Sequence, residues 1–243
     1  MSPREPLSTG SAADFIPPNP SLPKLRDAAR GCRGCDLWVN ATQTVFGEGP
    51  AHPEVMLVGE QPGDQEDRQG HPFVGPAGRL LDAALEEAGI DRKRVYVTNA
   101  VKHFKFVVIE RGRRLHKKPS PGEVRACNPW LREEIRVLQP RVIVVLGATA
   151  AQALLGKQFR VTQDRGKPMP SELAEAIVAT VHPSAVLRAP EDARELARQE
   201  FFADIKQVAK YVEGSRRTPK SYTGAVDSPS SKPVARRPRA SAK

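Results

Sequence analysis

The sequence predicts an α/β fold, a three-layer α/β/α sandwich around a central, mainly parallel, four-stranded sheet. Two observations lead to this fold. Four short runs rich in β-branched residues are apolar almost throughout, as strands that are covered on both faces must be. Helical patterns alternate with these runs, and crossovers of such length join parallel strands. The chain of 243 residues is long enough for one domain of this kind with a full core.

The expected elements follow in chain order. The strand sequences "EVMLVG", "RVYVTNA", "RVIVVLG" and "AIVATVH" occupy residues 54–59, 94–100, 141–147 and 176–182. Helical patterns occupy residues 21–31, 77–89, 120–138, 148–156 and about 191–212. In parallel α/β sheets, ligands bind beyond the carboxyl ends of the strands. We therefore expect a functional site where these four strands end.

Polar segments flank the expected domain. Residues 1–20 are rich in Pro, Ser and Gly, and residues 214–243 combine Ser, Pro, Lys and Arg with few large apolar groups. Both compositions predict disorder, which leaves residues 21–213 as the single folded domain. No run of about 18 apolar residues predicts a membrane span, and the N-terminus lacks the apolar core of a secretory signal.

The net charge of +10 favours a polyanionic partner. Its location matters, because residues 215–243 hold eight Lys or Arg and one Asp, a net of +7. Residues 1–214 hold 30 basic and 27 acidic residues, a net of only +3. The basic tail is either a solvated extension or a weak electrostatic aid on a nucleic acid.

The chain has three cysteines, Cys32, Cys35 and Cys127. The odd number argues against a disulfide scaffold and indicates a reducing, cytoplasmic setting. The Cys32-x2-Cys35 spacing suits a metal half-site, a redox pair or two unrelated thiols. Cys127 and His103, in "VKHFKF" after the second strand, are candidates for two further ligands. Three cysteines and a histidine suit zinc, with an iron–sulfur cluster as the rival.

Polar groups stand at the four strand ends. "GEQPG" places Gly59, Glu60 and Gln61 after the first strand, Asn99 ends the second, and Gly147 and His182 follow the third and fourth. A carboxylate can orient water or a base, an amide can read a nucleobase edge, and a histidine can donate to an oxygen that gains charge. Each also has a structural alternative, such as a turn-forming Asn. Their coincidence at one sheet edge favours a site.

Three further residues lie near these ends. Phe73, in the Gly/Pro loop "GHPFVGPAG", either fills the core or stacks on a flat ligand. Ser184 and Arg188, in "VHPSAVLR", suit phosphate contacts. The stretch "ERGRRLHKKPS" at residues 110–120 surrounds His116 with five cations and has no apolar period. Taken alone, it reads as a solvated charged loop.

The motifs "GEQPG", "PFVGPAG", "TNAVKHFKF" and "HPS" together resemble the uracil-DNA glycosylase superfamily, in the order found in its iron–sulfur, family-4 branch. The resemblance covers about residues 25–210. Family-4 members have a Cys where this chain has His103, and a shorter link to the next ligand Cys. The longer Arg/His-rich insertion ending in "RRxH", with "GEQPG" in place of "GEAPG", looks like the X-type uracil-DNA glycosylase. In that branch a loop histidine becomes covalently attached to DNA.

The resemblance implies a role for each matching residue. The catalytic residues would be Glu60, His116 and His182. The uracil-binding residues would be Gly59, Gln61, Phe73 and Asn99, together with His182. The DNA backbone would contact Arg113, Arg114, Lys117, Ser184 and Arg188. A [4Fe–4S] cluster, in preference to zinc, would be held by Cys32, Cys35, His103 and Cys127. The partner would be uracil-containing DNA. The protein would act as a monomer and would not bind a membrane.

The expected reaction excises uracil from DNA, single-stranded DNA in particular, since a base inside a duplex must first be flipped. Asn99 would read the uracil edge and reject cytosine, and His182 would stabilise the leaving anion. His116 would then capture the sugar C1′, with Glu60 orienting or deprotonating the imidazole. The surrounding cations, Arg113, Arg114, Lys117 and Lys118, would hold phosphates and lower the pKa of His116.

Three other interpretations remain. The first is an ordinary turnover family-4 glycosylase in which Glu60 acts on water. The second is a non-catalytic nucleic-acid-binding module with a structural metal. The third is a nucleotide-binding α/β protein, against which the absence of GxGxxG and Walker loops argues.

Overall fold

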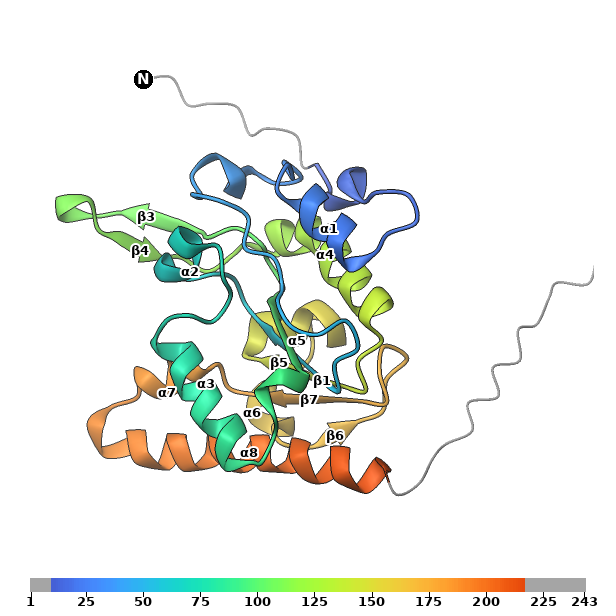
Figure 1. Cartoon of the computed structure of the whole chain (residues 1–243). Helices are drawn as coiled ribbons and strands as arrows, with labels where there is room; N and C mark the ends of the chain where they lie inside the picture. The colour runs from blue at the N-terminus through green and yellow to red at the C-terminus, as the bar shows by residue number, and fades with distance from the viewer. Residues whose placement is uncertain (1–9, 217–243) are drawn as a thin grey trace, which may run out of the picture.

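The central sheet of the computed structural model, which describes residues 10–216, has the strand order β2-β1-β5-β7-β6 (Figure 1). Its four parallel strands are β1 (Val55–Gly59), β2 (Val95–Asn99), β5 (Val142–Leu146) and β7 (Ala176–Thr180). These are the four strands that the sequence predicts. A fifth, β6 (Pro168–Met169), pairs antiparallel with β7 at the edge, so the prediction of four strands was one short. Two residues are too few to carry a strand pattern.

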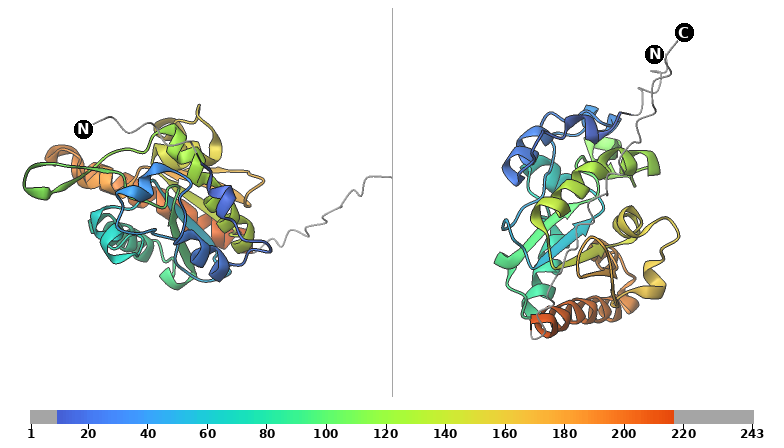
Figure 2. Two further views of the ribbon diagram at one scale, coloured as in Figure 1. Left: turned by 90° about the horizontal axis from the view of Figure 1, so that it is seen from above. Right: turned by 90° about the vertical axis from the view of Figure 1, so that its right-hand side faces the viewer.

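Helices cover both faces of the sheet, which confirms the three-layer sandwich (Figure 2). One face packs against α1 (Leu22–Ala29), α4 (Pro121–Leu138) and α5 (Ala148–Leu155). The other packs against α3 (Pro76–Glu87), α7 (Pro183–Leu187) and α8 (Glu191–Arg216). Alternate strand residues enter the two layers, as Met56 and Leu57 do in β1. Every residue of the four parallel strands is buried.

The smaller elements lie mostly in the connections. They are η1 (Ala12–Phe15), η2 (Asp36–Val39), α2 (Asp64–Gln69), η3 (Arg92–Arg94), β3 (Phe106–Val108), η4 (Glu110–Gly112), β4 (Arg114–His116) and α6 (Val161–Asp164). No helix within residues 10–216 is long and apolar enough to cross a membrane.

The expected disordered ends lie only partly within the described residues. Positions 1–9 and 217–243 are outside them. From position 10 onward the chain is folded, and Ala12 of η1 is buried in the core. At the other end, α8 continues to Arg216, three residues beyond the expected boundary. The folded region is therefore longer at both ends than the composition indicated.

The charged stretch 110–120 is largely a β-hairpin and not an irregular loop (Figure 1). Strand β4 pairs antiparallel with β3, so that His116 lies opposite Phe106 and Leu115 opposite Val107. Because side chains alternate along a strand, His116 and Arg114 share one face and Leu115 lies on the other. Directly after the hairpin, a capping box between Ser120 and Glu123 begins α4.

Candidate active site

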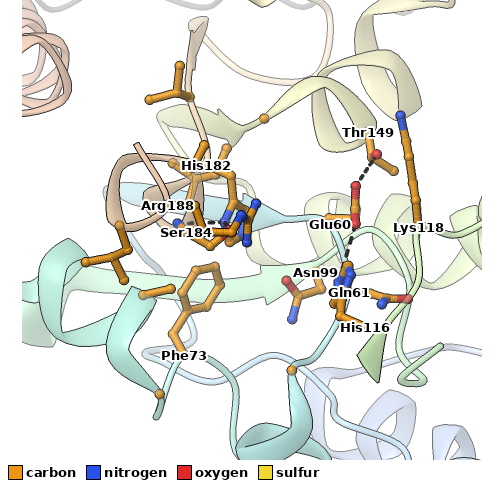
Figure 3. Close-up of a pocket in the computed structure, with 18 of the residues that line it drawn as sticks. Glu60, Gln61, Phe73, Asn99, His116, Lys118, Thr149, His182, Ser184 and Arg188 are labelled. Carbon is orange, nitrogen blue, oxygen red and sulfur yellow. Dashed lines mark hydrogen bonds and ion pairs between the residues drawn. The ribbon is translucent and has the colours of Figure 1, made fainter. Parts of the chain in front are cut away.

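The carboxyl ends of the four parallel strands border one pocket of about 800 Å³ (Figure 3). Glu60, Asn99, Gly147 and His182 follow or end β1, β2, β5 and β7. Other elements complete the lining, and the residues they contribute include Gln61, Phe73, His116, Lys118, Thr149, Ser184 and Arg188. The site residues that do not line this pocket are Gly59, Arg113, Arg114, Lys117, Cys32, Cys35, His103 and Cys127.

The carboxylate of Glu60 lies between two groups in the pocket (Figure 3). Its Oε2 atom accepts a hydrogen bond from the Thr149 hydroxyl at the start of α5. Its Oε1 atom lies 3.5 Å from Nε2 of His116. The Thr149 hydroxyl thus orients the carboxylate, and the free oxygen is directed at the imidazole. Thr149 was missed by the sequence analysis, because only the fold places it beside Glu60.

His116 is held neutral at neutral pH. Burial is the main cause of its lowered pKa, Arg188 lowers it further, and Glu60 opposes both. Burial and Arg188 thus lower the pKa, where the sequence analysis expected the cations of the hairpin. The imidazole is still 48% exposed, and its ring centroid lies 5.9 Å from that of Phe104. It is therefore an accessible group with a free ring lone pair.

Gln61 holds the base of the hairpin. Its buried amide donates to the Lys105 carbonyl over 3.2 Å and to the Lys117 carbonyl over 3.0 Å, and accepts from the Lys105 N–H over 3.2 Å. Both amide atoms are thus used inside the protein, although the residue borders the pocket. The side chain positions the strand that carries His116, whereas the sequence analysis expected it to contact uracil.

Arg114 is engaged inside the protein, where its ion pairs compete with the expected contact with the DNA backbone. Its guanidinium forms ion pairs with Asp64 and Asp67 of α2, the latter at 2.6 Å. It also lies over the Phe106 ring, 4.8 Å from the centroid, and is only 11% exposed. Arg113 and Lys117 are exposed. Arg114 therefore fastens the hairpin to α2, and the acidic partners are too distant in sequence to have been foreseen.

Asn99 and Phe73 form the floor of the pocket, and Gly59 makes room for both. A Cβ at position 59 would collide with Asn99 Oδ1 and lie 2.8 Å from Phe73 Cζ. The Asn99 side chain is almost fully buried, yet its amide has no hydrogen-bond partner within residues 10–216. Phe73 has a left-handed backbone with φ of 59°. Its ring stacks at 24° to that of His182, with 6.1 Å between centroids.

His182 presents a hydrogen-bond donor to the pocket. The backbone N–H of Ser184 donates to His182 Nδ1 over 3.1 Å, so this nitrogen carries no proton. The neutral ring must then hold its proton on Nε2. Burial lowers the pKa to about 4, with further lowering by Arg188 and His116. Ser184 also places its hydroxyl 2.8 Å from the same nitrogen, so it orients His182 besides any phosphate contact.

The candidate metal ligands lie together, away from this pocket. Cys32 and His103 line a second cavity of about 180 Å³. The pKa of Cys127 is raised to about 12, mainly by burial, against an opposing effect of Lys102. Cys35 and Cys32 contribute to the rise, which indicates that the three thiols are neighbours. Two of the sulfurs accept N–H hydrogen bonds, Cys127 from Lys102 over 3.3 Å and Cys32 from Trp130 over 3.2 Å.

The hydrogen bonds of His103 leave one ring nitrogen free for a metal. Thr44 donates its hydroxyl proton to the Ala29 carbonyl over 2.9 Å. The same oxygen, 2.9 Å from His103 Nε2, must therefore accept the ring proton. The lone pair of His103 is then on Nδ1, as a metal ligand requires.

The chemistry of the donor set, three thiols and one imidazole, is compatible with an iron–sulfur cluster. A single zinc ion needs four donors within about 2.3 Å of one point. In the described part of the chain, no three His, Cys, Asp or Glu side chains are arranged around a single ion. A four-iron cluster is larger, because each ligand binds a different iron atom, and N–H bonds to its sulfurs are usual.

Comparisons with known proteins agree with the geometry. The family model described as "Uracil DNA glycosylase superfamily" matches residues 46–206. The type-4 uracil-DNA glycosylase of Thermotoga maritima is 36% identical over 78% of this chain and 93% of its own length. That of Sulfurisphaera tokodaii is 35% identical over 84% and 88%, and that of Pyrobaculum aerophilum 39% over 76% and 91%. The chain belongs to the uracil-DNA glycosylase superfamily.

Proposed function

We propose that the protein excises uracil from DNA, as a step of DNA repair, and that His116 then captures the exposed sugar, as in X-type members. Family membership and the type-4 relatives support the glycosylase activity. One observation carries the covalent step: His116 Nε2 lies 3.5 Å from Glu60 Oε1 at the strand-end pocket.

The pocket has the groups that uracil recognition needs. A flipped base would stack on Phe73, which offsets part of the cost of unstacking, about a few kcal/mol. The unpartnered Asn99 amide would bind the uracil edge, whereas the amino group of cytosine would face its donor end. The cost of flipping is smallest in single-stranded DNA, which we propose as the preferred substrate.

His182 and His116 would act on opposite sides of the glycosidic bond. When the C1′–N1 bond breaks, its electron pair leaves with uracil, and His182 Nε2–H donates to the developing oxyanion. The lone pair of a His116 ring nitrogen then forms a bond to C1′. The proton on the other ring nitrogen passes to Glu60 or stays as an imidazolium beside that carboxylate. The product is an imidazole–C1′ adduct plus free uracil.

We propose that Cys32, Cys35, His103 and Cys127 hold a [4Fe–4S] cluster. When bound, it would supply a cross-link between separate parts of the chain. Cys127 belongs to α4, and His103 lies beyond the end of β2. A visible absorption spectrum and an iron assay of the purified protein test this assignment without any activity measurement.

A denaturing gel tests the covalent proposal. Incubation with a uracil-containing single strand should give a shifted band that survives heat and SDS, and a duplex should give it more slowly. His116→Ser should release free uracil without a shifted band, because serine supplies no imidazole nucleophile. Leu115→Ser is the matched control and should cross-link like the wild type, since Leu115 lies on the opposite face of β4.

Two results would contradict the covalent proposal. A His116→Ser protein that still cross-links would place the nucleophile elsewhere. Free abasic product with multiple turnovers by the wild type would instead favour the ordinary type-4 reaction, in which Glu60 acts on water. Binding without any base release would remove the glycosylase activity itself.

A further inference from the structure

A buried lysine next to the pocket has no part in the chemistry above. The Lys102 side chain is 1% exposed. Its ammonium donates to the Asn99 carbonyl over 2.8 Å, to the Thr98 hydroxyl over 2.6 Å and to the Glu134 carboxylate. An ammonium has three N–H donors, so this one is fully used. One of its three bonds goes to the residue whose amide lines the uracil pocket.

The partner carboxylate is equally well satisfied. Glu134, on α4, is completely buried. It accepts from the Tyr96 hydroxyl over 2.8 Å and from the Thr98 hydroxyl over 3.0 Å, besides Lys102. Replacing a buried ion pair by apolar residues is often neutral or stabilising, so such a pair is weak evidence for a role in stability. A role in position is the alternative.

Hydrogen bonds of the backbone around Asn99 hold this residue in place. The N–H of Ala100 donates to the Gly59 carbonyl over 2.8 Å, and the N–H of Val101 to the Glu60 carbonyl over 3.0 Å. The turn after β2 is thereby bonded to the end of β1. The Lys102 ammonium donates to the backbone carbonyl of Asn99 itself. Since the amide of Asn99 has no internal partner, the direction of this side chain depends on the backbone that these bonds hold.

We propose that Lys102, with Glu134 as its counter-ion, is a positioning residue that holds Asn99 for the uracil edge. This inference rests on the proposed uracil excision. The sequence offered no sign of it, because a lysine in "NAVKHF" resembles any surface cation. If Lys102 and Glu134 served stability alone, the rate of uracil release would fall only as the free energy of unfolding falls. The loss would then be the same with or without the Asn99 side chain.

A double-mutant cycle with Asn99→Ala tests the proposal. Lys102→Met combined with Glu134→Gln removes both charges and leaves neither partner as an orphan ion. The single-turnover rate of uracil release should fall about tenfold or more, because small displacements of a binding group are costly. Adding Asn99→Ala should then cost little, since its contribution is already lost. Thermal melts establish that each variant is folded at the assay temperature.

Tyr96→Phe is the matched control. It removes one hydrogen bond of the same network without touching Asn99. In the Tyr96→Phe background, Asn99→Ala should lower the rate of uracil release by the same factor as in the wild type. Full additivity of Asn99→Ala with the Lys102/Glu134 pair would overturn the proposal. If the pair does not fold, Lys102→Met alone enters the cycle with the same criterion, since it removes the bond to Asn99 while Glu134 keeps its bonds from Tyr96 and Thr98. Failure of the wild type to release uracil would instead refute the proposed function.

Discussion

Two neutral histidines face the pocket, and their difference in exposure suits different tasks. His182 is the more deeply buried and has its Nδ1 occupied by Ser184, so it can only donate from Nε2. His116 is half exposed at the hairpin and lies next to Glu60. Arg188 lowers the pKa of both rings. Burial, with this cation as a smaller cause, keeps the first as a neutral donor and the second as a nucleophile.

The pH dependence of cross-linking should reflect this arrangement. Protonation removes the lone pair of His116, so the rate falls as pH drops through its pKa. Because that pKa lies below the usual 6.5, the rate should stay flat from pH 8 to 6.5 and fall only below. Arg188→Gln should move the falling limb to higher pH, since one cause of the lowering is gone. Timed gels of adduct formation at each pH measure this. An unmoved limb would mean that Arg188 does not act on His116.

At the scale of elements, the hairpin depends on contacts made at its base. Gln61 bonds Lys105 and Lys117, which flank the two strands, and Arg114 fastens β4 to α2. Few other contacts hold it, as Val108 and Leu115 are 65% and 44% exposed. The position of His116 over the pocket is therefore set by these two side chains more than by a packed core.

Gln61→Ala should separate capture from excision. It removes three hydrogen bonds to the hairpin but leaves Asn99, Phe73 and His182 in place, so uracil release should continue while the adduct yield falls about tenfold. Gln152→Ala is the matched control, because its amide also donates to a backbone carbonyl, that of Phe159, away from the hairpin. Parallel assays of free uracil and of adduct measure both steps. An equal loss of both steps would show that Gln61 serves the pocket directly.

Periodic elements were predictable, and contacts between distant residues were not. The apolar patterns predict the four buried strands and the helices from α3 to α5. The rule that ligands bind at the carboxyl ends of parallel strands places Glu60, Asn99 and His182 together. The hairpin was not predicted because each of its strands has only three, largely exposed residues and the second strand is rich in basic residues. The roles of Arg114, Gln61 and Lys102 could not be predicted for another reason. Each depends on a partner that is distant in sequence and that only the fold brings near, namely Asp67, Lys117 and Glu134.

At the scale of the whole molecule, the strand order explains the location of the pocket. From β1 the chain crosses to β2 through α3 on one face, and then returns past β1 to β5 through α4 on the other. The direction of winding changes between β1 and β5, which opens a crevice at their carboxyl ends. Glu60 follows β1 and Thr149 follows β5, and their hydrogen bond spans this crevice.

Charge is distributed unevenly over the same molecule. Residues 1–216 hold 31 Lys or Arg and 27 Asp or Glu, a net of +4, and residues 217–243 hold seven and one, a net of +6. Several cations of the folded part, such as Arg114 and Arg165, are paired with carboxylates. Most of the unbalanced charge available to DNA phosphates is therefore in the segment 217–243.

Removing residues 217–243 should weaken DNA binding and reduce its dependence on salt. Each cation that contacts a phosphate of single-stranded DNA adds about 0.7 to the slope of log affinity against log salt. The truncated protein should therefore show a shallower slope, and its affinity should approach that of the full chain at high salt. A chain of full length with these seven cations changed to Gln is the control for length and should match the truncation. Titrations of a labelled oligonucleotide at several salt concentrations give the slopes.

At saturating DNA the rate of adduct formation should be unchanged, because the pocket groups all lie within residues 10–216. Equal slopes for the full and truncated chains would show that the tail does not reach the DNA.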